Sequence, residues 1–253
     1  MFELGWRMLL VELGNTRIKS TLCGESGIGD VFQITHSSPT WQKDFKSYLA
    51  SLAQPVRVCY IASVASVALT ASLEQLVTRN LALQPVEIKA QKDFLGVING
   101  YQAVETLGVD RWLAMIAAYQ RFPQGVCVVD SGTATTVDVV DRFGQHRGGL
   151  ILPGLKLAQN MLQNQTARIE INAEMEKTSP LLADNTSTAV YSGIVHATRA
   201  LIDLTMREEG NGCALVLTGG AAHEIGMEWT GASISPNLVL EGLYLVAKSC
   251  RQN

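Results

Sequence analysis

The stretch Val11-Glu12-Leu13-Gly14-Asn15-Thr16 has a counterpart 118 residues further on, in Val129-Asp130-Ser131-Gly132-Thr133-Ala134. Each copy consists of the end of an apolar run, an acid, a variable residue, a glycine and a small residue. Because the copies begin nearly half of a 253-residue chain apart, they predict two related α/β domains, residues 1–119 and 120–253. The alternative is coincidence, since an acid followed by a glycine is a common turn after a strand.

Composition is typical of a folded protein of the cytoplasm. Apolar residues make up 47% of the chain and charged residues 17%, which supports a hydrophobic core and excludes disorder. The net charge of −3 leaves no basic excess for a phosphate backbone, so we expect no nucleic-acid partner. The longest uncharged run, Val58–Leu73, is too short and too polar to span a bilayer, so we expect no membrane partner. Five cysteines without a CxxC pair favour free thiols in a reducing cytosol.

The spacing of apolar residues predicts strands that alternate with helices, which is typical of an α/β fold. The predicted strands are residues 9–13, 18–23, 31–35, 56–63, 86–88, 126–129, 135–140, 148–152 and 214–218. The predicted helices are residues 41–52, 67–80, 110–120, 186–208 and 238–248.

Several familiar catalytic motifs do not occur in the sequence. It has no GxxxxGK[ST] loop, no HExxH and no GxSxG, and its four histidines are scattered. Asp130-Ser131-Gly132-Thr133 resembles the motif of an aspartic protease, which needs two matching aspartates. The other turn carries Glu12 instead, and alternating helices and strands do not fit an all-β protease.

Two turns that each join an acid to a glycine suit the phosphates of a nucleotide better. Backbone N–H groups in tight turns bind phosphate oxygens, and glycine allows the phosphate to approach closely. Thr16 and Thr133 add hydroxyl donors, and Lys19 adds a positive charge. A third turn, Gly219-Gly220, follows a predicted buried strand and would receive an adenosine. Three such turns in this order resemble the layout of the acetate kinase, sugar kinase, Hsp70 and actin superfamily.

The segment Leu107-Gly108-Val109-Asp110-Arg111-Trp112 places an aspartate and an arginine side by side at the start of a predicted helix. Asp110 would accept a proton from a substrate hydroxyl, and Arg111 would bind a carboxylate with two hydrogen bonds. The alternative is that Asp110 caps the helix and Arg111 is solvated.

The chain as a whole resembles a type III pantothenate kinase over about residues 9–245. The matching blocks are residues 12–19 (ELGNTRIK), 62–64 (ASV), 99–101 (NGY), 107–114 (LGVDRWLA), 130–138 (DSGTATTVD), 148–154 (GGLILPG), 185–186 (NT), 192–194 (SGI), 218–220 (TGG) and 238–243 (LVLEGL). Each block alone is common, whereas their common order and spacing are specific.

The resemblance implies two ribonuclease H-like domains with the nucleotide site between them, and transfer of phosphate from ATP to pantothenate, the first step of coenzyme A synthesis. It implies a homodimer that uses ATP with Mg²⁺ and a monovalent cation, K⁺ or NH₄⁺. Asp110 would be the catalytic base, and Asp130 would bind the monovalent cation. The implied ATP-binding residues are Glu12, Leu13, Gly14, Asn15, Thr16, Arg17, Ile18, Lys19, Gly132, Thr133, Gly219 and Gly220. The implied pantothenate-binding residues are Tyr101, Gly108, Val109, Asp110, Arg111 and Thr186, the last from the partner subunit.

The chain departs from the family pattern at two positions. Glu12 stands where the family normally has Asp, and its extra methylene would disturb a water-bridged Mg²⁺. Val104 stands where the family often has Pro, a minor change. Two rival functions stay open at this point: another small-molecule kinase of the same superfamily, and a non-catalytic homologue that acts as a regulatory or accessory binding protein.

Overall fold

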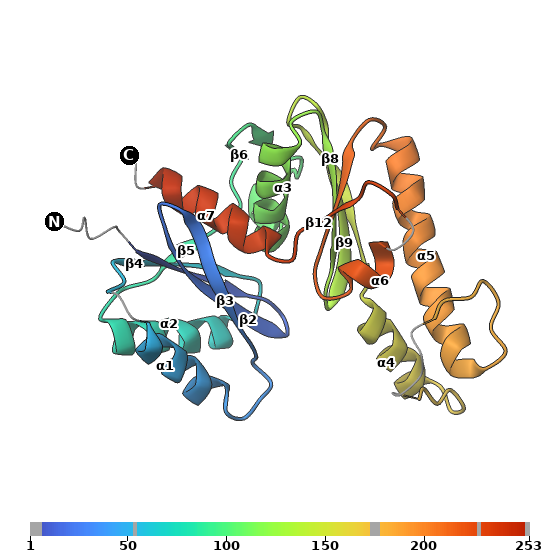
Figure 1. Cartoon of the computed structure of the whole chain (residues 1–253), viewed down its shortest axis with the longest axis horizontal. Helices are drawn as coiled ribbons and strands as arrows, with labels where there is room; N and C mark the ends of the chain where they lie inside the picture. Colours follow the sequence, from blue (N-terminus) through green and yellow to red (C-terminus); the bar gives the residue numbers. More distant parts are fainter. Residues whose placement is uncertain (1–6, 53–54, 173–177, 227–228, 251–253) are drawn as a thin grey trace. The chain divides into compact units, whose positions relative to one another are not determined.

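The structure is a computed structural model that describes residues 7–52, 55–172, 178–226 and 229–250. The chain forms two compact units (Figure 1). Unit 1 takes in residues 1–92, 101–117 and 238–253, and unit 2 takes in residues 93–100 and 118–237. The C-terminal segment therefore groups with unit 1. The predicted domain boundaries, 1–119 and 120–253, stay a prediction, and their outermost residues lie outside the described ranges.

Unit 1 contains a five-stranded sheet in the order β3-β2-β1-β4-β5. β2 is antiparallel to both β1 and β3, whereas β4 is parallel to both β1 and β5. Its strands are β1 (Met8–Leu13), β2 (Arg17–Gly24), β3 (Gly27–Thr35), β4 (Val58–Ser63) and β5 (Val86–Ile88). Its helices are α1 (Trp41–Ser51), α2 (Val67–Leu81), the short 3₁₀ helix η1 (Val104–Thr106), most of α3 (Val109–Arg121) and α7 (Leu238–Cys250).

The two faces of this sheet are set by alternation along β1. Leu9, Val11 and Leu13 are fully buried in one hydrophobic cluster with side chains of α1 and α2. Met8, Leu10 and Glu12 project from the opposite face, because successive side chains of a strand alternate. Figure 1 shows α1 and α2 on one side of the sheet and α7 on the other. Glu12 is therefore directed away from α1 and α2.

A glycine allows α7 to lie directly against α3. A Cβ atom at Gly242 would collide with the carbonyl oxygen and carbon of Leu113. Since only glycine lets two backbones approach so closely, Gly242 fixes the N-terminal part of α3, which carries Asp110 and Arg111, within unit 1.

Unit 2 repeats the sheet of unit 1 strand for strand. Its order is β10-β9-β8-β11-β12, with β9 antiparallel to β8 and β10, and β11 parallel to β8 and β12. Its strands are β8 (Val126–Ser131), β9 (Ala134–Val140), β10 (His146–Pro153), β11 (Ala214–Thr218) and β12 (Ser233–Ile234), with a separate hairpin of β6 (Asp93–Phe94) and β7 (Val97–Ile98). Its helices are α4 (Leu155–Gln165), α5 (Thr186–Glu208), α6 (Ala222–Gly226) and the end of α3.

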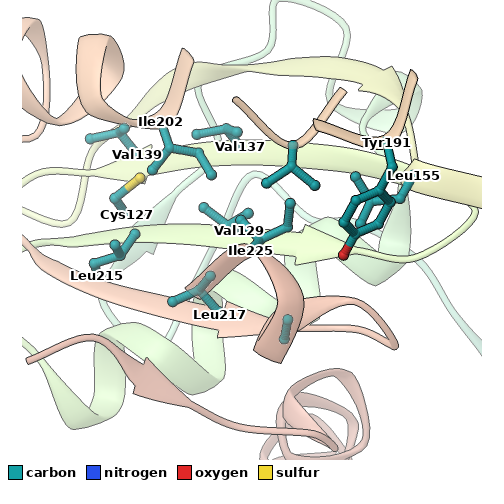
Figure 2. Packing of buried hydrophobic residues seen from close by; sticks show 12 residues of the cluster. Cys127, Val129, Val137, Val139, Leu155, Tyr191, Ile202, Leu215, Leu217 and Ile225 are labelled. Carbon is teal, nitrogen blue, oxygen red and sulfur yellow. The ribbon is translucent and has the colours of Figure 1, made fainter. Parts of the chain in front are cut away.

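The core of unit 2 lies between one face of this sheet and helices α5 and α6 (Figure 2). Cys127 and Val129 of β8 are fully buried there with Ile202 of α5 and Ile225 of α6. By alternation, Asp130 of β8 projects from the opposite face, as Glu12 does in unit 1. The predicted alternation of strands and helices is confirmed, and both acid-and-glycine turns follow the first strand of their sheets.

Within the described ranges, no helix has both the length and the apolar character needed to cross a membrane.

Candidate active site

The acid of the first turn lies beside a lysine on the neighbouring strand. Glu12 of β1 is the register partner of Lys19 of β2, and the Lys19 Nζ lies 3.7 Å from the Glu12 Oε2. Both side chains are largely buried, and Oε2 is fully buried with no partner at hydrogen-bond distance among the described residues. Burial raises the pKa of Glu12, and the Lys19 charge opposes this rise, while the nearby charge of Asp110 adds to it. Two carboxylates and one ammonium group therefore share this corner of unit 1.

The first turn, Gly14–Arg17, is closed by its own backbone and by a histidine. The Gly14 N–H donates to the Arg17 carbonyl at 3.0 Å. His36, which follows β3, donates its backbone N–H to the Thr16 carbonyl at 3.1 Å, and its Nε2 lies 3.2 Å from the Gly14 carbonyl oxygen. Asn15, Thr16 and Arg17 are exposed, so the turn is fixed on one side and open to a ligand on the other.

Asp110 lies in the first turn of α3, immediately after Gly108. Its Oδ1 accepts a hydrogen bond from the Arg111 N–H at 2.8 Å. A Cβ atom at Gly108 would lie 2.6 Å from the same oxygen, so a glycine at position 108 leaves room for the carboxylate. Asp110 lies inside α3, one residue after its start, so its carboxylate stabilises the first turn of the helix without occupying the N-cap position. Its charge also contributes to the raised pKa of Glu12, which places the carboxylate near the first turn.

Arg111 is buried, and it pairs with Tyr101. The Arg111 Nη1 donates to the Tyr101 hydroxyl at 2.7 Å, and the guanidinium carbon lies 5.5 Å from the centre of the tyrosine ring. The solvated-arginine alternative is wrong, because only 7% of Arg111 is exposed. A guanidinium group carries five N–H donors in a planar arrangement that matches the two oxygens of a carboxylate.

The turn in unit 2 carries no lysine opposite its acid. The register partner of Asp130 is Thr136, at the position that corresponds to Lys19. The Gly132 N–H donates to the Ala134 carbonyl at 2.9 Å and the Gly154 N–H donates to the Thr133 carbonyl at 3.0 Å. This turn is one residue shorter than the first and is closed in the same manner.

The third turn packs directly on Asp130. Gly219 has a φ of +88°, and a Cβ atom there would collide with the Asp130 Oδ1 and the Ser131 carbonyl oxygen. Both oxygens therefore lie close to one point beside Gly219. The Ala221 N–H donates to the Ser131 carbonyl at 3.0 Å, which ties the third turn to the second.

A buried arginine that sequence reasoning missed holds the helix after this third turn. The Arg199 Nε and Nη2 of α5 donate to the Ile225 and Glu224 carbonyls of α6 at 3.1 and 2.9 Å. The Tyr191 hydroxyl donates to the Glu224 Oε2 at 3.0 Å, and burial followed by this contact raises the pKa of Tyr191 to about 12. Spacing along α5 gave no sign of these contacts, because their partners lie 25–33 residues away.

Thr186 is exposed at the start of α5. The preceding Asn185 caps the helix, with its Oδ1 accepting from the Thr188 N–H at 2.9 Å. Leu181 and Leu182, 81% and 88% exposed, lie just before it in the chain. Thr186 is therefore available to another molecule.

The predicted site residues divide between the two units. Unit 1 holds the set made of Glu12, Leu13, Gly14, Asn15, Thr16, Arg17, Ile18, Lys19, Tyr101, Gly108, Val109, Asp110 and Arg111. Unit 2 holds the set made of Asp130, Gly132, Thr133, Thr186, Gly219 and Gly220. His36 and Arg199 are additions that sequence reasoning did not find. Over the described residues, no group of three or more His, Cys, Asp or Glu side chains forms a metal centre.

Comparison with known proteins gives the family. A family model described as type III pantothenate kinase matches residues 8–208. The chain belongs to the type III pantothenate kinase family. A type III pantothenate kinase of Nitrosococcus oceani is 34% identical over 95% of this chain and 94% of its own length. Another, of Alkalilimnicola ehrlichii, is 35% identical over 95% of this chain and 97% of its own length. The resemblance found in the sequence is confirmed.

Solved structures of low identity show the fold. A putative Baf family transcriptional activator from Campylobacter jejuni has a TM-score of 0.64 at 21% identity, covering 97% of this chain and 100% of its own. MreB 5 of Spiroplasma citri, crystallised with AMPPNP, has a TM-score of 0.54 at 11% identity, covering 98% of each chain. The predicted α/β architecture of two ribonuclease H-like domains is confirmed. The position of the nucleotide between the domains stays a prediction from the sequence.

Proposed function

We propose that this chain is a pantothenate kinase, which phosphorylates pantothenate with ATP to give 4′-phosphopantothenate in the synthesis of coenzyme A. The observation that carries the proposal is the match to relatives named type III pantothenate kinase over 95% of the chain. The contacts within each unit supply groups that suit the steps of this reaction.

Asp110 is proposed as the base. The hydroxyl oxygen of pantothenate forms a bond to the γ-phosphorus, its proton passes to a carboxylate oxygen of Asp110, and the bond between the γ-phosphorus and the departing ADP breaks. Phosphoryl transfer has a loose transition state, so positioning and charge stabilisation matter more than proton removal. The first turn, open to a ligand on one side, and the Lys19 charge on the neighbouring strand suit that demand.

Arg111 and Tyr101 are proposed to hold the acceptor by its carboxylate. Their 2.7 Å hydrogen bond holds the guanidinium in one orientation, so binding a carboxylate there costs little side-chain entropy. Gly108 and Val109 lie at the start of α3, which carries both Asp110 and Arg111. The helix therefore holds the proposed base and the proposed carboxylate-binding group at a fixed separation.

Residues 12–19, which include the first turn, are proposed to bind the phosphates of ATP. Gly132, Thr133, Gly219 and Gly220 of unit 2 are proposed as further ATP-binding residues. Mg²⁺ is proposed beside Glu12, whose buried Oε2 has no partner at hydrogen-bond distance among the described residues, in a water-bridged position that the extra methylene shifts relative to Asp. Mg²⁺ bound through water to this carboxylate would neutralise phosphate charge.

A monovalent cation is proposed at Asp130. Its Oδ1 and the Ser131 carbonyl oxygen approach the same point, and the residue opposite, Thr136, is neutral. One carboxylate with neutral oxygens suits K⁺ or NH₄⁺ better than a second Mg²⁺.

A homodimer is proposed, with β10 and α4 of unit 2 at its interface. β10 is an outer strand of its sheet and exposes Ile151 at 64%. Helix α4 exposes Leu157, Met161 and Leu162. Apolar side chains on an open sheet edge and the following helix are suited to a second copy. The exposed Thr186 would then contact pantothenate bound to the partner.

The five cysteines, all free, favour the cytoplasm as the location.

The test is a panel of acceptors assayed for ADP release by the purified chain. The panel contains pantothenate, pantothenol, which lacks the carboxylate, and unrelated alcohols and sugars. Pantothenate should be preferred, and mass spectrometry should identify 4′-phosphopantothenate. Preference for an unrelated acceptor would assign the chain to another kinase of the superfamily.

An Ile151→Glu, Met161→Glu double variant should be monomeric by light scattering, and a dimer that persists would rule out this interface.

A further inference from the structure

His36 makes two contacts with the first turn from a distant part of the sequence. Its backbone N–H donates to the Thr16 carbonyl, and its ring Nε2 lies 3.2 Å from the Gly14 carbonyl oxygen, 22 residues away. A carbonyl oxygen only accepts, so the ring must carry a proton on Nε2. The side chain is partly buried and directly follows β3, so the end of that strand carries it over the turn.

The ring contact fixes the orientation of one peptide group. In a trans peptide the C=O and the following N–H point in opposite directions. When His36 holds the Gly14 carbonyl, the Asn15 N–H therefore points away from His36. Asn15 is exposed, and its N–H donates to none of the described residues. This N–H is available to a phosphate oxygen.

Unit 2 provides an internal comparison at the corresponding position. Gly154 follows β10 as His36 follows β3, and it donates its N–H to the Thr133 carbonyl as His36 does to the Thr16 carbonyl. A Cβ atom at Gly154 would collide with the Gly132 carbonyl oxygen. In unit 2 the backbone thus packs directly on the turn, whereas in unit 1 the His36 ring fills the corresponding space. The contact between the His36 ring and the Gly14 carbonyl therefore holds the longer first turn in a fixed conformation.

We propose that His36 is a positioning residue for nucleotide binding, which orients the Gly14–Asn15 peptide so that the Asn15 N–H faces the ATP phosphates. This inference rests on the proposed function, because it assumes that the first turn binds ATP. His36 acts through the turn and needs no contact with the nucleotide. Its loss should weaken binding of phosphates and leave the binding of pantothenate unchanged.

The experiment compares His36→Ala, His36→Gln and His36→Asn. The Gln amide nitrogen is as many bonds from Cα as the His Nε2, whereas the Asn amide nitrogen is one bond closer. His36→Ala and His36→Asn should raise the KM for ATP about tenfold, the effect expected of one hydrogen bond to a charged group. His36→Gln should restore most of the affinity, and the KM for pantothenate should stay within about twofold in all three.

His196→Ala is the matched control. The His196 Nε2 lies 3.1 Å from the Ser179 carbonyl oxygen in unit 2, so the variant loses a similar contact away from the first turn. Its KM for ATP should equal that of the parent. Calorimetry without pantothenate adds a second measurement, in which His36→Ala should bind ATP more weakly while thermal melting shows it folded.

The outcomes separate the two proposals. A His36→Ala variant with the parent's affinity for ATP would overturn the role of His36 and leave the kinase assignment intact. An equal rise of both KM values, or no recovery in His36→Gln, would also overturn it, because it would indicate a general structural role. A parent chain that binds no ATP would overturn the proposed function and this inference with it.

Discussion

The two acid-and-glycine turns occupy equivalent places in the same sheet topology and differ in what surrounds their acids. In unit 1 the acid is Glu12, and its register partner is Lys19. In unit 2 the acid is Asp130, and its register partner is Thr136. The first turn therefore has a fixed positive charge beside its carboxylate, and the second has a neutral hydroxyl group there.

This difference indicates that the repulsion between a bound phosphate and the acid would be offset differently at the two turns. A carboxylate at about 4 Å from a phosphate is repelled by about 4 kcal/mol at an effective dielectric constant near 20. In unit 1, Lys19 offsets that repulsion with a covalently attached charge. In unit 2 the monovalent cation proposed at Asp130 would supply the same offset, so we expect activity to depend on the salt present.

The largest expected effect is at Asp110, the second carboxylate near the first turn. Asp110→Asn keeps the shape and removes the proton acceptor, so turnover should fall about 10²–10⁴-fold with pantothenate affinity largely kept. Glu105→Gln, which removes an exposed carboxylate from η1, is the control and should match the parent. If the turnover of Asp110→Asn stays within a few-fold of the parent, Asp110 serves only to stabilise the helix.

Exchange of the monovalent cation tests the second turn. At fixed ionic strength, replacing potassium chloride with sodium or tetramethylammonium chloride should lower turnover about tenfold or more, since each 1.4 kcal/mol of lost stabilisation is tenfold in rate. Asp130→Ala should lose most of its activity and become insensitive to the salt. Equal rates of the parent in all three salts would leave Asp130 as a turn residue without a metal role.

A lysine placed in unit 2 tests the comparison between the turns. Thr136→Lys puts an ammonium group opposite Asp130, at the position that corresponds to Lys19. The ratio of turnover in potassium to turnover in sodium should fall toward one, because the attached charge replaces the mobile cation. Thr136→Met adds similar bulk without charge and should keep the parent's ratio. A ratio unchanged by Thr136→Lys would mean that charge does not explain the difference between the turns.

The smallest expected effect is at Glu12 itself. Glu12→Asp moves the carboxylate back by about one bond length, away from Lys19, and should lower the KM for ATP as Lys19 becomes available to phosphate. Because the shorter carboxylate stays near Lys19, only part of their attraction is lost, and a loss of about 0.2–1 kcal/mol corresponds to a change of about 1.5- to 5-fold. The KM for pantothenate serves as the control. A loss of activity would instead show that this turn is adapted to glutamate.

Strongly patterned elements of the fold could be predicted from the sequence. Helix α5 and strand β11 have the bounds that apolar spacing predicted. Helix α5 has its start marked by the capping residue Asn185, and β11 is a short buried run before Gly219. In unit 1, the observed bounds of each predicted strand and helix lie within a few residues of the predicted bounds.

Other elements had no local signal. Helix α4 begins after Gly154, which offers no side-chain cap, and much of its apolar surface is exposed. Strand β12 is two residues long, and α7 joins unit 1 by packing against β1, β2, β3 and β4, which lie far from it in the sequence.

The candidate site was predictable where its chemistry lies in contiguous motifs. Asp110, Arg111 and both turns were found in this way. His36 and Arg199 were missed, because each acts on backbone carbonyls far away in the sequence. The burial of Arg111 was also missed, since it depends on how α3 packs in unit 1.

Rescue of a bacterial strain that lacks its own pantothenate kinase tests directly whether this chain phosphorylates pantothenate with Asp110 as the base. The measurement is growth on pantothenate as the only source of coenzyme A, with the parent chain and with Asp110→Asn at equal expression. We expect growth with the parent chain and none, or greatly slowed growth, with Asp110→Asn. Failure of the folded parent chain to support growth, or equal growth with both, would contradict this expectation.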